Sequence, residues 1–489
     1  MDNKLREIDI QPDDRVVYIH IPKTAGTTFK IILQSLLWGF NYYPDWKFIN
    51  LGNDELEKIR QYQLFIGHFT HSLFSETIFP DGFIGLTFLR DPVKRTISHL
   101  RFMHQEFQQG TLYNYYPQKK GNVIKETSLR ELAKALLMAE GYKDIDLLME
   151  FLINNNYKLA ANFVDYQVKI MGTKKRDLKT KVVKQETPTI TFENLDLAQK
   201  RLEDLAFFGL TDRYQDSLFL LSYIFGWRPI LNTLHLNESQ KPERVAGPSA
   251  TVKAMIEENL TLDIPFYKFG EQLFQQRFHD MTEALLKCYG KREHATLKWP
   301  VPNDLIVKLL EQHYIKRRDQ RLRHLSPHSR FLAYRPSMYT ESPFGWYPLE
   351  NSDIHGDYRW SGPGLQSGFD LPCPTGKDIR ISFCLLAAME FGIIEGLSLT
   401  INGIPIEIQF TTDPEGRFVF SGDVPRQAIS GPFFRLIFSV PKTVTPHSLD
   451  QNNVDCRSLG IALNWINLQS LSDFSTHEFS TPNRKPQTT

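Results

Sequence analysis

The sequence predicts two fold classes in one chain, an α/β region built on a mainly parallel sheet and an all-β region after it. From Val16 to about Cys288, apolar runs of strand length alternate with segments that have the 3.6-residue period of helices. From about Phe344 the period changes to two, and short strand-like runs are separated by Gly and Pro turns. The first pattern is typical of a parallel sheet covered on both faces, and the second of a β-sandwich or jelly roll.

Four apolar runs are expected to form the strands of the α/β region. They are VVYIHI at 16–21, LFIG at 64–67, FIGLTFL at 83–89 and AFFGL at 206–210. Helices are expected between and after these strands, because apolar residues recur there every three to four positions. Their predicted ranges are 27–37, 92–105, 128–139, 194–205, 213–225 and 266–288.

Five alternating runs are expected to form the strands of the β region: DIRISFCL, LSLTINGIPIEIQF, RFVFSG, FFRLIFSV and LGIALNWINL. Within the second run, Asn402-Gly403 predicts a two-residue type I′ hairpin turn. A basic amphipathic helix is expected at 306–325, where a solvated connecting role is favoured over binding to a membrane surface or partner. The predicted domains are 1–290 (α/β), 291–343 (helical linker), 344–472 (β) and 473–489 (flexible tail).

Composition limits the classes of function. The 489 residues include 57 Lys+Arg and 56 Asp+Glu, and this balance argues against a nucleic-acid binder that works by bulk charge. The N-terminus is charged and lacks the apolar core of a signal peptide, and no run approaches the roughly 18 to 20 apolar residues of a membrane helix. A cytoplasmic protein without a transmembrane segment is predicted. The cysteines follow no metal-site spacing and are expected to be free, mostly buried thiols: Cys288, Cys373, Cys384 and Cys456.

The first functional motif is PKTAGTT, which joins the first predicted strand to the first predicted helix. At a helix N-terminus, backbone N–H groups lack intrahelical partners and the dipole is positive. Gly26 allows a ligand to approach the backbone closely, and Lys23 adds a full positive charge. Hydroxyl groups are offered by Thr24, Thr27 and Thr28. The loop suits a phosphate or sulfate but is not a Walker A sequence, and an ordinary turn with a capping threonine is the alternative.

The second motif is FLRDPVKRTISH, again a strand, a turn and a helix. Arg90 ends the strand, Pro92 suits the first helical position, and Ser98 lies about two turns into the helix. An arginine and a hydroxyl group so placed can hold one phosphate between them. Because ligands bind at the carboxyl edge of open parallel sheets, Lys23 and Arg90 are predicted to face one crevice. The alternative is that Arg90 pairs with Asp91 or another acid and that Ser98 is a surface residue.

Together, HIPKTAGTT and FLRDPVKRTISH resemble the paired motifs of the Golgi-type carbohydrate sulfotransferase superfamily, especially its heparan sulfate 2-O-sulfotransferase-like branch. FFGLTDRYQDSLFLL resembles a third family segment. The resemblance covers roughly residues 16–290 and implies a P-loop-like, mainly parallel sheet sandwiched by helices. It also implies an enzyme that transfers a sulfuryl group from 3′-phosphoadenosine 5′-phosphosulfate (PAPS) to a hydroxyl of a saccharide or glycolipid, without a metal. The β region is not part of the core family.

The resemblance also implies roles for individual residues. Lys23 would contact the oxygen that bridges phosphate and sulfate and would stabilise the leaving group. Arg90 and Ser98 would hold the 3′-phosphate. The 5′-phosphate and sulfuryl oxygens would be held by Thr24, Ala25, Gly26, Thr27 and Thr28.

In the family, the catalytic base is a histidine in a segment between the two motifs that often reads Gly-His. Here LFIGHFTHSLF offers His68 directly after Gly67, and His71 three residues later. We predict His68 as the base, with His71 as the second candidate or a substrate contact. Relatives that read His-Gly-His have another histidine where this chain has Ile66, so the substrate contact made there stays open.

Other functions remain open from the sequence. The chain could be a catalytically inactive saccharide-binding or assembly protein or, less favoured, a nucleotide kinase. The predicted location fits a bacterial-type enzyme that modifies a saccharide or lipid-linked precursor in the cytosol. The acceptor sugar and the oligomeric state are undefined, since the loop at 109–122 carries no recognisable code. In the β region some aromatic residues are candidates for stacking on sugars, with core packing as the alternative: Trp346, Tyr347, Tyr358, Trp360 and Trp465.

Overall fold

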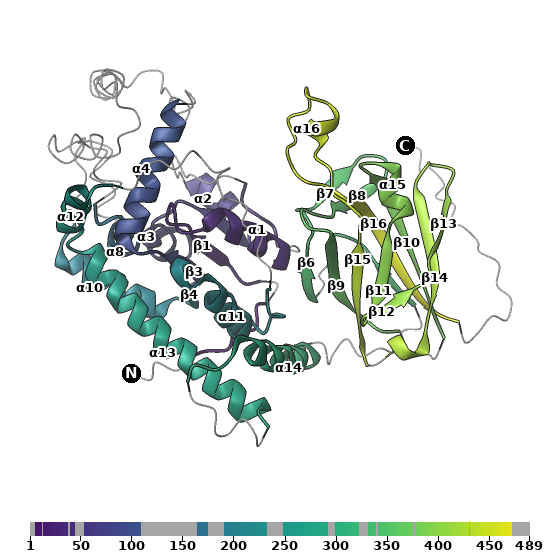
Figure 1. Cartoon of the computed structure of the whole chain (residues 1–489), viewed down its shortest axis with the longest axis horizontal. Helices are drawn as coiled ribbons and strands as arrows, with labels where there is room; N and C mark the ends of the chain where they lie inside the picture. Colours follow the sequence, from purple (N-terminus) through teal and green to yellow (C-terminus); the bar gives the residue numbers. More distant parts are fainter. Residues whose placement is uncertain are drawn as a thin grey trace. The chain divides into compact units, whose positions relative to one another are not determined.

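A computed structural model gives the arrangement of most of the chain (Figure 1). It describes residues 5–11, 13–37, 40–44, 53–108, 164–174, 190–231, 248–291, 299–321, 331–338, 341–374, 378–429 and 431–471. The chain divides into two compact units, which we call the α/β unit (residues 1–30 and 40–318) and the β unit (residues 31–39 and 319–489). Across the described ranges, no helix combines the length and the apolar character that crossing a membrane requires.

A four-stranded parallel sheet forms the centre of the α/β unit, in the order β2-β1-β3-β4 (Figure 1). Its strands are β1 (Val16–Ile19), β2 (Leu64–Gly67), β3 (Ile84–Leu89) and β4 (Phe207–Leu210). Every neighbouring pair runs parallel. Nearly all strand residues are buried, and because alternate residues point to opposite faces, both faces of the sheet are covered. The predicted parallel α/β region is confirmed.

Five helices predicted for the α/β region, at 27–37, 92–105, 194–205, 213–225 and 266–288, are present, with ends within three residues of the predicted ones. The helices at 53–59, 71–73, 166–172 and 250–259 were not predicted. The predicted helix at 128–139 and the loop at 109–122 lie outside the described residues. The helices are α1 (Gly26–Leu36), α2 (Asn53–Ile59), α3 (His71–Leu73), α4 (Pro92–Gln108), α8 (Tyr166–Gly172), α10 (Phe192–Asp204), α11 (Tyr214–Phe225), α12 (Ala250–Asn259), α13 (Asp263–Tyr289) and α14 (Asn303–Arg321), with short turns η1 (Phe74–Ile78) and η3 (Thr211–Arg213). Residues 31–36 of α1 and 319–321 of α14 are counted with the β unit.

Helix α14 is the predicted basic amphipathic helix. Its His313 ring donates from Nε2 to the carbonyl oxygen of Tyr223 at 3.0 Å. Its Arg317 guanidinium pairs with Glu7 at 2.8 Å and with Asp9 at 2.7 Å. Both His313 and Arg317 are buried. These contacts make this part of the helix a packed component of the α/β unit.

Two antiparallel sheets form the β unit (Figure 1). One has the order β13-β14-β10-β16-β8-β7, with β5 paired to β16, and the other the order β12-β11-β15-β9-β6. The strands are β5 (Phe331–Tyr334), β6 (Glu341–Phe344), β7 (Glu350–Ser352), β8 (Gly356–Trp360), β9 (Gln366–Pro372), β10 (Ile379–Ala388), β11 (Ser398–Ile401), β12 (Ile404–Ile406), β13 (Gln409–Thr412), β14 (Phe418–Val424), β15 (Phe433–Ser439) and β16 (Ile461–Ser470).

Residues from both sheets share one hydrophobic core. Phe383 of β10 and Phe438 of β15, for example, place their ring centroids 5.2 Å apart across the core. The predicted all-β region is therefore confirmed, and its assignment as a jelly roll stays a prediction. The predicted hairpin is also present: Ile401 pairs with Ile404, and both turn residues have positive φ, 51° at Asn402 and 80° at Gly403.

The four cysteines are free thiols. Cys373 and Cys384 are buried, and burial raises the pKa of each thiol to about 11. Cys288 and Cys456 are exposed, so the expectation that the thiols are mostly buried is wrong for half of them. Cys288 lies in the last turn of α13, beyond Leu285, which is the last buried residue of that helix.

Candidate active site

The predicted site segments follow the C-terminal ends of three neighbouring parallel strands. Lys23 comes after β1, His68 after β2 and Arg90 after β3. Strand β1 lies between the other two in the sheet. The loop after β1 therefore has the candidate base on one side and the arginine on the other, at the sheet edge where open α/β proteins bind ligands.

The loop after β1 has an unusual backbone. Lys23 has a φ of 71° and Ala25 a φ of 64°, both in the left-handed region that residues with a Cβ seldom adopt. Such conformations cost about 1–3 kcal/mol each and persist where the surroundings enforce them, often at ligand sites. Alternation of left-handed and ordinary residues turns successive N–H groups toward one concavity, which suits an anion. Helix α1 then begins at Gly26 and adds its own unpaired N–H groups.

The threonines of this loop differ in what they can offer a ligand. Thr24 is fully buried, and its hydroxyl donates to the carbonyl oxygen of Ile21 at 2.7 Å. That hydroxyl proton holds the loop together, so Thr24 has only its backbone to offer an anion. Thr28 is half-buried and Thr27 is exposed.

Arg90 connects the two predicted motifs directly. Its Nη1 donates to the carbonyl oxygen of Lys23 at 3.0 Å. Burial lowers the pKa of Arg90, and the nearby carboxylates of Asp212 and Asp91 oppose this shift. Among the described residues, the buried Nε of Arg90 has no hydrogen-bond partner. An anion bound beside the loop could accept from this nitrogen.

The backbone of Arg90 is held by a residue that the sequence did not indicate. The Gln167 side chain accepts from the Arg90 N–H at 3.2 Å and donates to the Arg90 carbonyl oxygen at 2.9 Å. Gln167 is fully buried in α8. Its amide thus makes the two backbone hydrogen bonds that a neighbouring strand would make at the end of β3. These bonds fix the position of Arg90.

Two aspartates hold α8 in place by capping each other's helix. Asp165, at the start of α8, accepts from the backbone N–H groups of Leu262 at 2.9 Å and Asp263 at 2.8 Å. Asp263, at the start of α13, accepts from the N–H groups of Gln167 at 3.1 Å and Val168 at 2.8 Å. Burial raises the pKa of Asp263 to about 6. Each carboxylate satisfies the unpaired donors of the other helix, which fixes the position of Gln167.

Helix α4 brings further side chains toward the loop. The Lys23 ammonium lies 4.5 Å from the centroid of the Phe102 ring. Ser98 is half-buried, and within the described residues its hydroxyl makes no hydrogen bond to Arg90. The next residue, His99, is a neighbour that the sequence analysis did not single out. Burial lowers the pKa of His99 to about 3, and nearby positive charges, Lys23 among them, add to the shift.

His68 is exposed, and its geometry defines which nitrogen carries a proton. Its Nδ1 lies 2.9 Å from the carbonyl oxygen of His20. Because a carbonyl oxygen can only accept, Nδ1 is the donor in this contact. In the neutral ring, Nε2 therefore carries the lone pair, as a general base requires.

His71 is in a different setting. It is 9% exposed, its Nδ1 lies 3.2 Å from the Ser75 hydroxyl, and its ring packs against Phe83. Burial lowers the pKa of His71 to about 3, with a contribution from Arg201. A buried ring engaged in this way is poorly placed to meet a substrate, so the geometry favours His68.

His20 is the other residue that the sequence analysis missed. It stands within the HIPKTAGTT motif, and its ring centroid lies 4.5 Å from that of His68. Burial lowers the pKa of His20 to about 3, and the charges of His68, Lys30 and Lys23 add to the shift. The sequence signal for His20 is its position directly before the loop, near the end of a run that predicts a strand.

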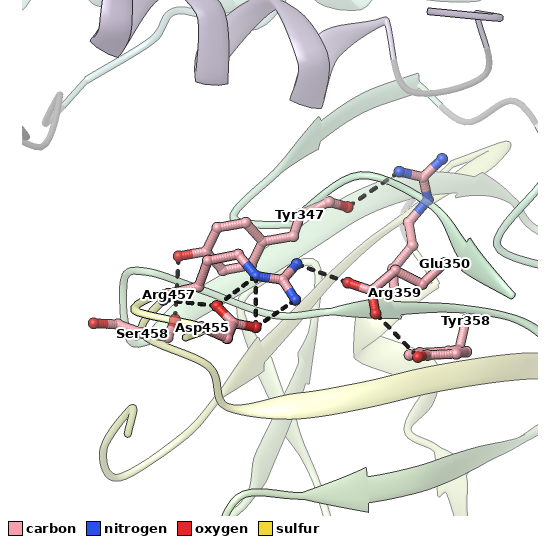
Figure 2. Close-up of polar contacts among 7 residues, drawn as sticks. All are labelled: Tyr347, Glu350, Tyr358, Arg359, Asp455, Arg457 and Ser458. Carbon is pink, nitrogen blue, oxygen red and sulfur yellow. Dashed lines mark hydrogen bonds and ion pairs between the residues drawn. The ribbon is translucent and has the colours of Figure 1, made fainter. Parts of the chain in front are cut away.

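The aromatic candidates of the β unit fall into two groups. Trp346 is 3% exposed and belongs to the core, so core packing is correct for this residue. Tyr347 is half-buried and donates its hydroxyl to the Ser458 carbonyl oxygen at 3.3 Å, while the Arg457 guanidinium lies 5.2 Å from its ring centroid (Figure 2). One face of the Tyr347 ring is therefore already covered.

Tyr358, Trp360 and Trp465 remain partly exposed. Residues Tyr358 and Trp360 share one face of β8, because the buried Arg359 between them points to the other. The Tyr358 hydroxyl donates to Glu350 at 3.0 Å, and the same carboxylate accepts from Arg457 at 2.7 Å (Figure 2). This network fixes the tyrosine without covering it fully.

Comparison with known proteins shows what the site region is similar to. Residues 6–182 match the model of the sulfotransferase family, and this range includes the loop, His68, Arg90 and Ser98. The predicted resemblance to carbohydrate sulfotransferases is thereby confirmed for the N-terminal region, while the narrower 2-O-sulfotransferase-like branch stays a prediction.

Individual relatives share little sequence identity with this chain. Heparan-sulfate 6-O-sulfotransferase 3 of Mus musculus is 24% identical over 242 residues, which cover 45% of this chain and 46% of the relative. The protein of the same name from Homo sapiens is 23% identical over 242 residues, covering 45% of each chain. The chain spans about half the length of the curated relatives it matches.

Solved structures give only weak similarity. A family 35 carbohydrate binding module from Clostridium thermocellum is 9% identical, with a TM-score of 0.18, and covers 29% of this chain and 98% of its own. A family GH115 4-O-methyl-alpha-glucuronidase is 10% identical, with a TM-score of 0.16, and covers 94% of this chain and 56% of its own. Scores this low support no argument about fold or function.

Proposed function

We propose that the α/β unit transfers a sulfuryl group from PAPS to a hydroxyl group of a glycan. One observation carries the proposal: the left-handed loop after β1 lies between His68, whose Nε2 carries the lone pair, and Arg90, whose Nε has no hydrogen-bond partner within the described ranges. The match of residues 6–182 to the sulfotransferase family supports it.

The loop and its neighbours fit the negatively charged donor. Lys23, Ala25 and Gly26 would offer a charge and backbone N–H groups to the 5′-phosphate and sulfuryl oxygens, with Thr24 contributing through its backbone and Thr27 and Thr28 through hydroxyls. Arg90 and Ser98 would hold the 3′-phosphate. In the part of the chain that the structure describes, no group of three or more His, Cys, Asp or Glu side chains could hold a metal ion.

The proposed chemistry needs two groups at the reacting atoms. The acceptor oxygen forms a bond to sulfur while the bond from sulfur to the bridging oxygen breaks. The Nε2 atom of His68 takes the proton of the attacking hydroxyl, a role that contributes typically about 10²–10⁴-fold. Lys23 stabilises the negative charge that develops on the bridging oxygen.

We also propose that the β unit contacts the saccharide. Tyr358 and Trp360 support this proposal, because they leave aromatic surface exposed on one face of β8 and Glu350 adds a hydrogen-bonding group beside them. Aromatic rings with polar neighbours suit the apolar faces and hydroxyls of sugars. In this proposal, residues 1–290 form the catalytic domain and residues 344–472 an accessory domain.

The proposed function is tested with the spent donor, 3′-phosphoadenosine 5′-phosphate, and with labelled PAPS. We expect the spent donor, but not ATP, to raise the melting temperature, and label to pass to a component of a glycan extract from the source cells. His68→Ala should lower kcat by about 10²–10⁴-fold while the affinity for the spent donor stays within about threefold. Equal stabilisation by ATP would indicate a nucleotide kinase, and binding without transfer an inactive saccharide-binding protein.

A further inference from the structure

His20 occupies the space between the candidate anion loop and the candidate base. Its backbone N–H donates to the Gly67 carbonyl oxygen at 2.9 Å, which extends the pairing of β1 with β2 by one residue. Its own carbonyl oxygen accepts from Nδ1 of His68 at 2.9 Å. The position of the His68 ring is therefore defined by the backbone of His20.

The side chain of His20 packs against the start of α1. A Cβ atom added to Gly26 would lie 1.8 Å from Nε2 and 2.1 Å from Cδ2 of His20. The ring also stacks on Tyr18, with centroids 5.5 Å apart and planes 14° apart, and lies 4.5 Å from the ring of His68. The ring thus touches both the loop and the base.

This contact explains why residue 26 is a glycine. Gly26 is absent from the residues with positive φ, so an alanine could adopt its backbone conformation. A larger residue at position 26 would force the His20 ring to move, since the closest approaches are all to that ring. The identity of residue 26 and the position of residue 20 are therefore coupled.

We propose that His20 is a positioning residue whose ring sets the spacing between the anion loop at Gly26 and the base His68, while its carbonyl oxygen fixes the proton on Nδ1 of His68. This inference rests on the proposed sulfuryl transfer. The ring stays uncharged at neutral pH, because the burial of His20 and the charges of His68, Lys30 and Lys23 oppose its protonation. It is a spacer that adds no further positive charge beside the base.

The alternative explanation is that Gly26 serves only to let the donor approach the backbone. The two explanations predict different outcomes when residues 20 and 26 are substituted together. If the ring and the glycine are coupled, removal of the ring makes room for a methyl group at position 26. If the glycine serves only the donor, removal of the ring has no such effect.

The test compares the wild type with Gly26→Ala, His20→Ala, the double variant and His20→Phe, in the full chain and with the acceptor identified by the labelling assay. Gly26→Ala should lower kcat by about 10²-fold, because displacement of the base by about 1 Å has effects of that size. The double variant should recover at least about tenfold over Gly26→Ala. His20→Phe, which keeps a ring, should retain a kcat closer to the wild type than His20→Ala does, with the affinity for 3′-phosphoadenosine 5′-phosphate little changed in both.

Failure of this inference and failure of the proposed function give different results. An active wild type in which the double variant is no better than Gly26→Ala would overturn the inference alone, as would equal kcat values for His20→Phe and His20→Ala. A wild type that neither binds the spent donor nor transfers label would overturn the proposed function, and the inference with it. If Gly26→Ala does not fold, the comparison of His20→Phe with His20→Ala decides.

Discussion

Three histidines near the candidate site, His20, His71 and His99, lie in surroundings that disfavour their protonated forms. Burial lowers the pKa of each to about 3, and neighbouring positive charges add to the shift. These rings are therefore neutral at physiological pH and add no positive charge for an anionic ligand, whereas lysine and arginine side chains such as Lys23 and Arg90 do. A binding site whose charge is carried by lysine and arginine should hold an anion equally well over a wide range of neutral pH.

The shifted pKa of His71 predicts a contribution to acid sensitivity. Because its pKa is about 3 in the folded protein and about 6.5 in an unfolded chain, only the unfolded chain takes up this proton between those pH values. Stability is therefore lost as pH falls through this window, by roughly 1.4 kcal/mol per pH unit. His71→Leu lacks this effect, and Ser75 keeps a partner because it also donates to the carbonyl oxygen of residue 71.

Urea unfolding of wild type and His71→Leu at pH 7.5 and 5.0 would measure the effect. Relative to the wild type, the variant should gain about 2 kcal/mol in free energy of unfolding between the two pH values. His279→Leu serves as the control, because the side chain of that histidine on α13 is 42% exposed, whereas His71 is buried. If the free energy of unfolding changes equally with pH in His71→Leu and in the wild type, the conclusion that His71 is buried in its neutral form is wrong.

At the scale of elements, the sequence predicted the features that depend on residues close to one another in the chain. The strands of the parallel sheet, the Asn402-Gly403 hairpin and the helix after Asp91 all have local signals, namely periodicity, turn chemistry and capping. The capping of α8 and α13 has no such signal, because Asp165 and Asp263 lie 98 positions apart. Such pairs become visible only when the fold brings two helix N-termini together.

The contact between Gln167 and Arg90 predicts a selective effect on donor binding. Gln167→Leu removes both hydrogen bonds that hold the Arg90 backbone, so we expect the affinity for 3′-phosphoadenosine 5′-phosphate to fall roughly tenfold or more. The kcat at saturating donor should change by less than about threefold, because in the described part of the chain Gln167 makes its hydrogen bonds to Arg90 and Asp263 and none to the candidate base or the loop. Isothermal titration calorimetry and steady-state kinetics would measure the two effects.

A matched control exists within the same unit. Gln215 also donates its amide to a backbone carbonyl oxygen, that of Ile230 at 3.0 Å, away from the candidate site. Gln215→Leu should leave the affinity for the spent donor unchanged. Equal losses of affinity in the two variants would show that Gln167 acts through general stability and not through Arg90.

At the scale of the whole molecule, the two units should unfold in separate transitions, since each is compact by itself.

A buried ion pair offers a way to identify the unfolding transition of the β unit. Arg435 donates to Asp370 at 2.9 Å, and both side chains are buried. Arg435→Ala leaves a buried carboxylate without this partner and should lower the stability of that transition by about 3–5 kcal/mol. Arg380→Ala, which breaks an exposed pair with Asp423, should cost at most about 1 kcal/mol.

With the transitions assigned, calorimetry can locate where each ligand binds. A ligand raises the transition of the unit that holds it, by RT ln(1 + [L]/Kd) in free energy. We expect 3′-phosphoadenosine 5′-phosphate to raise only the transition that Arg435→Ala leaves unchanged. The saccharide acceptor should raise the transition of the β unit, and the double substitution Tyr358→Ala with Trp360→Ala should abolish that shift while kcat at saturating acceptor is retained. A saccharide that shifts the α/β transition alone would restrict the site to that unit and remove the proposed role of the β sheets in acceptor binding.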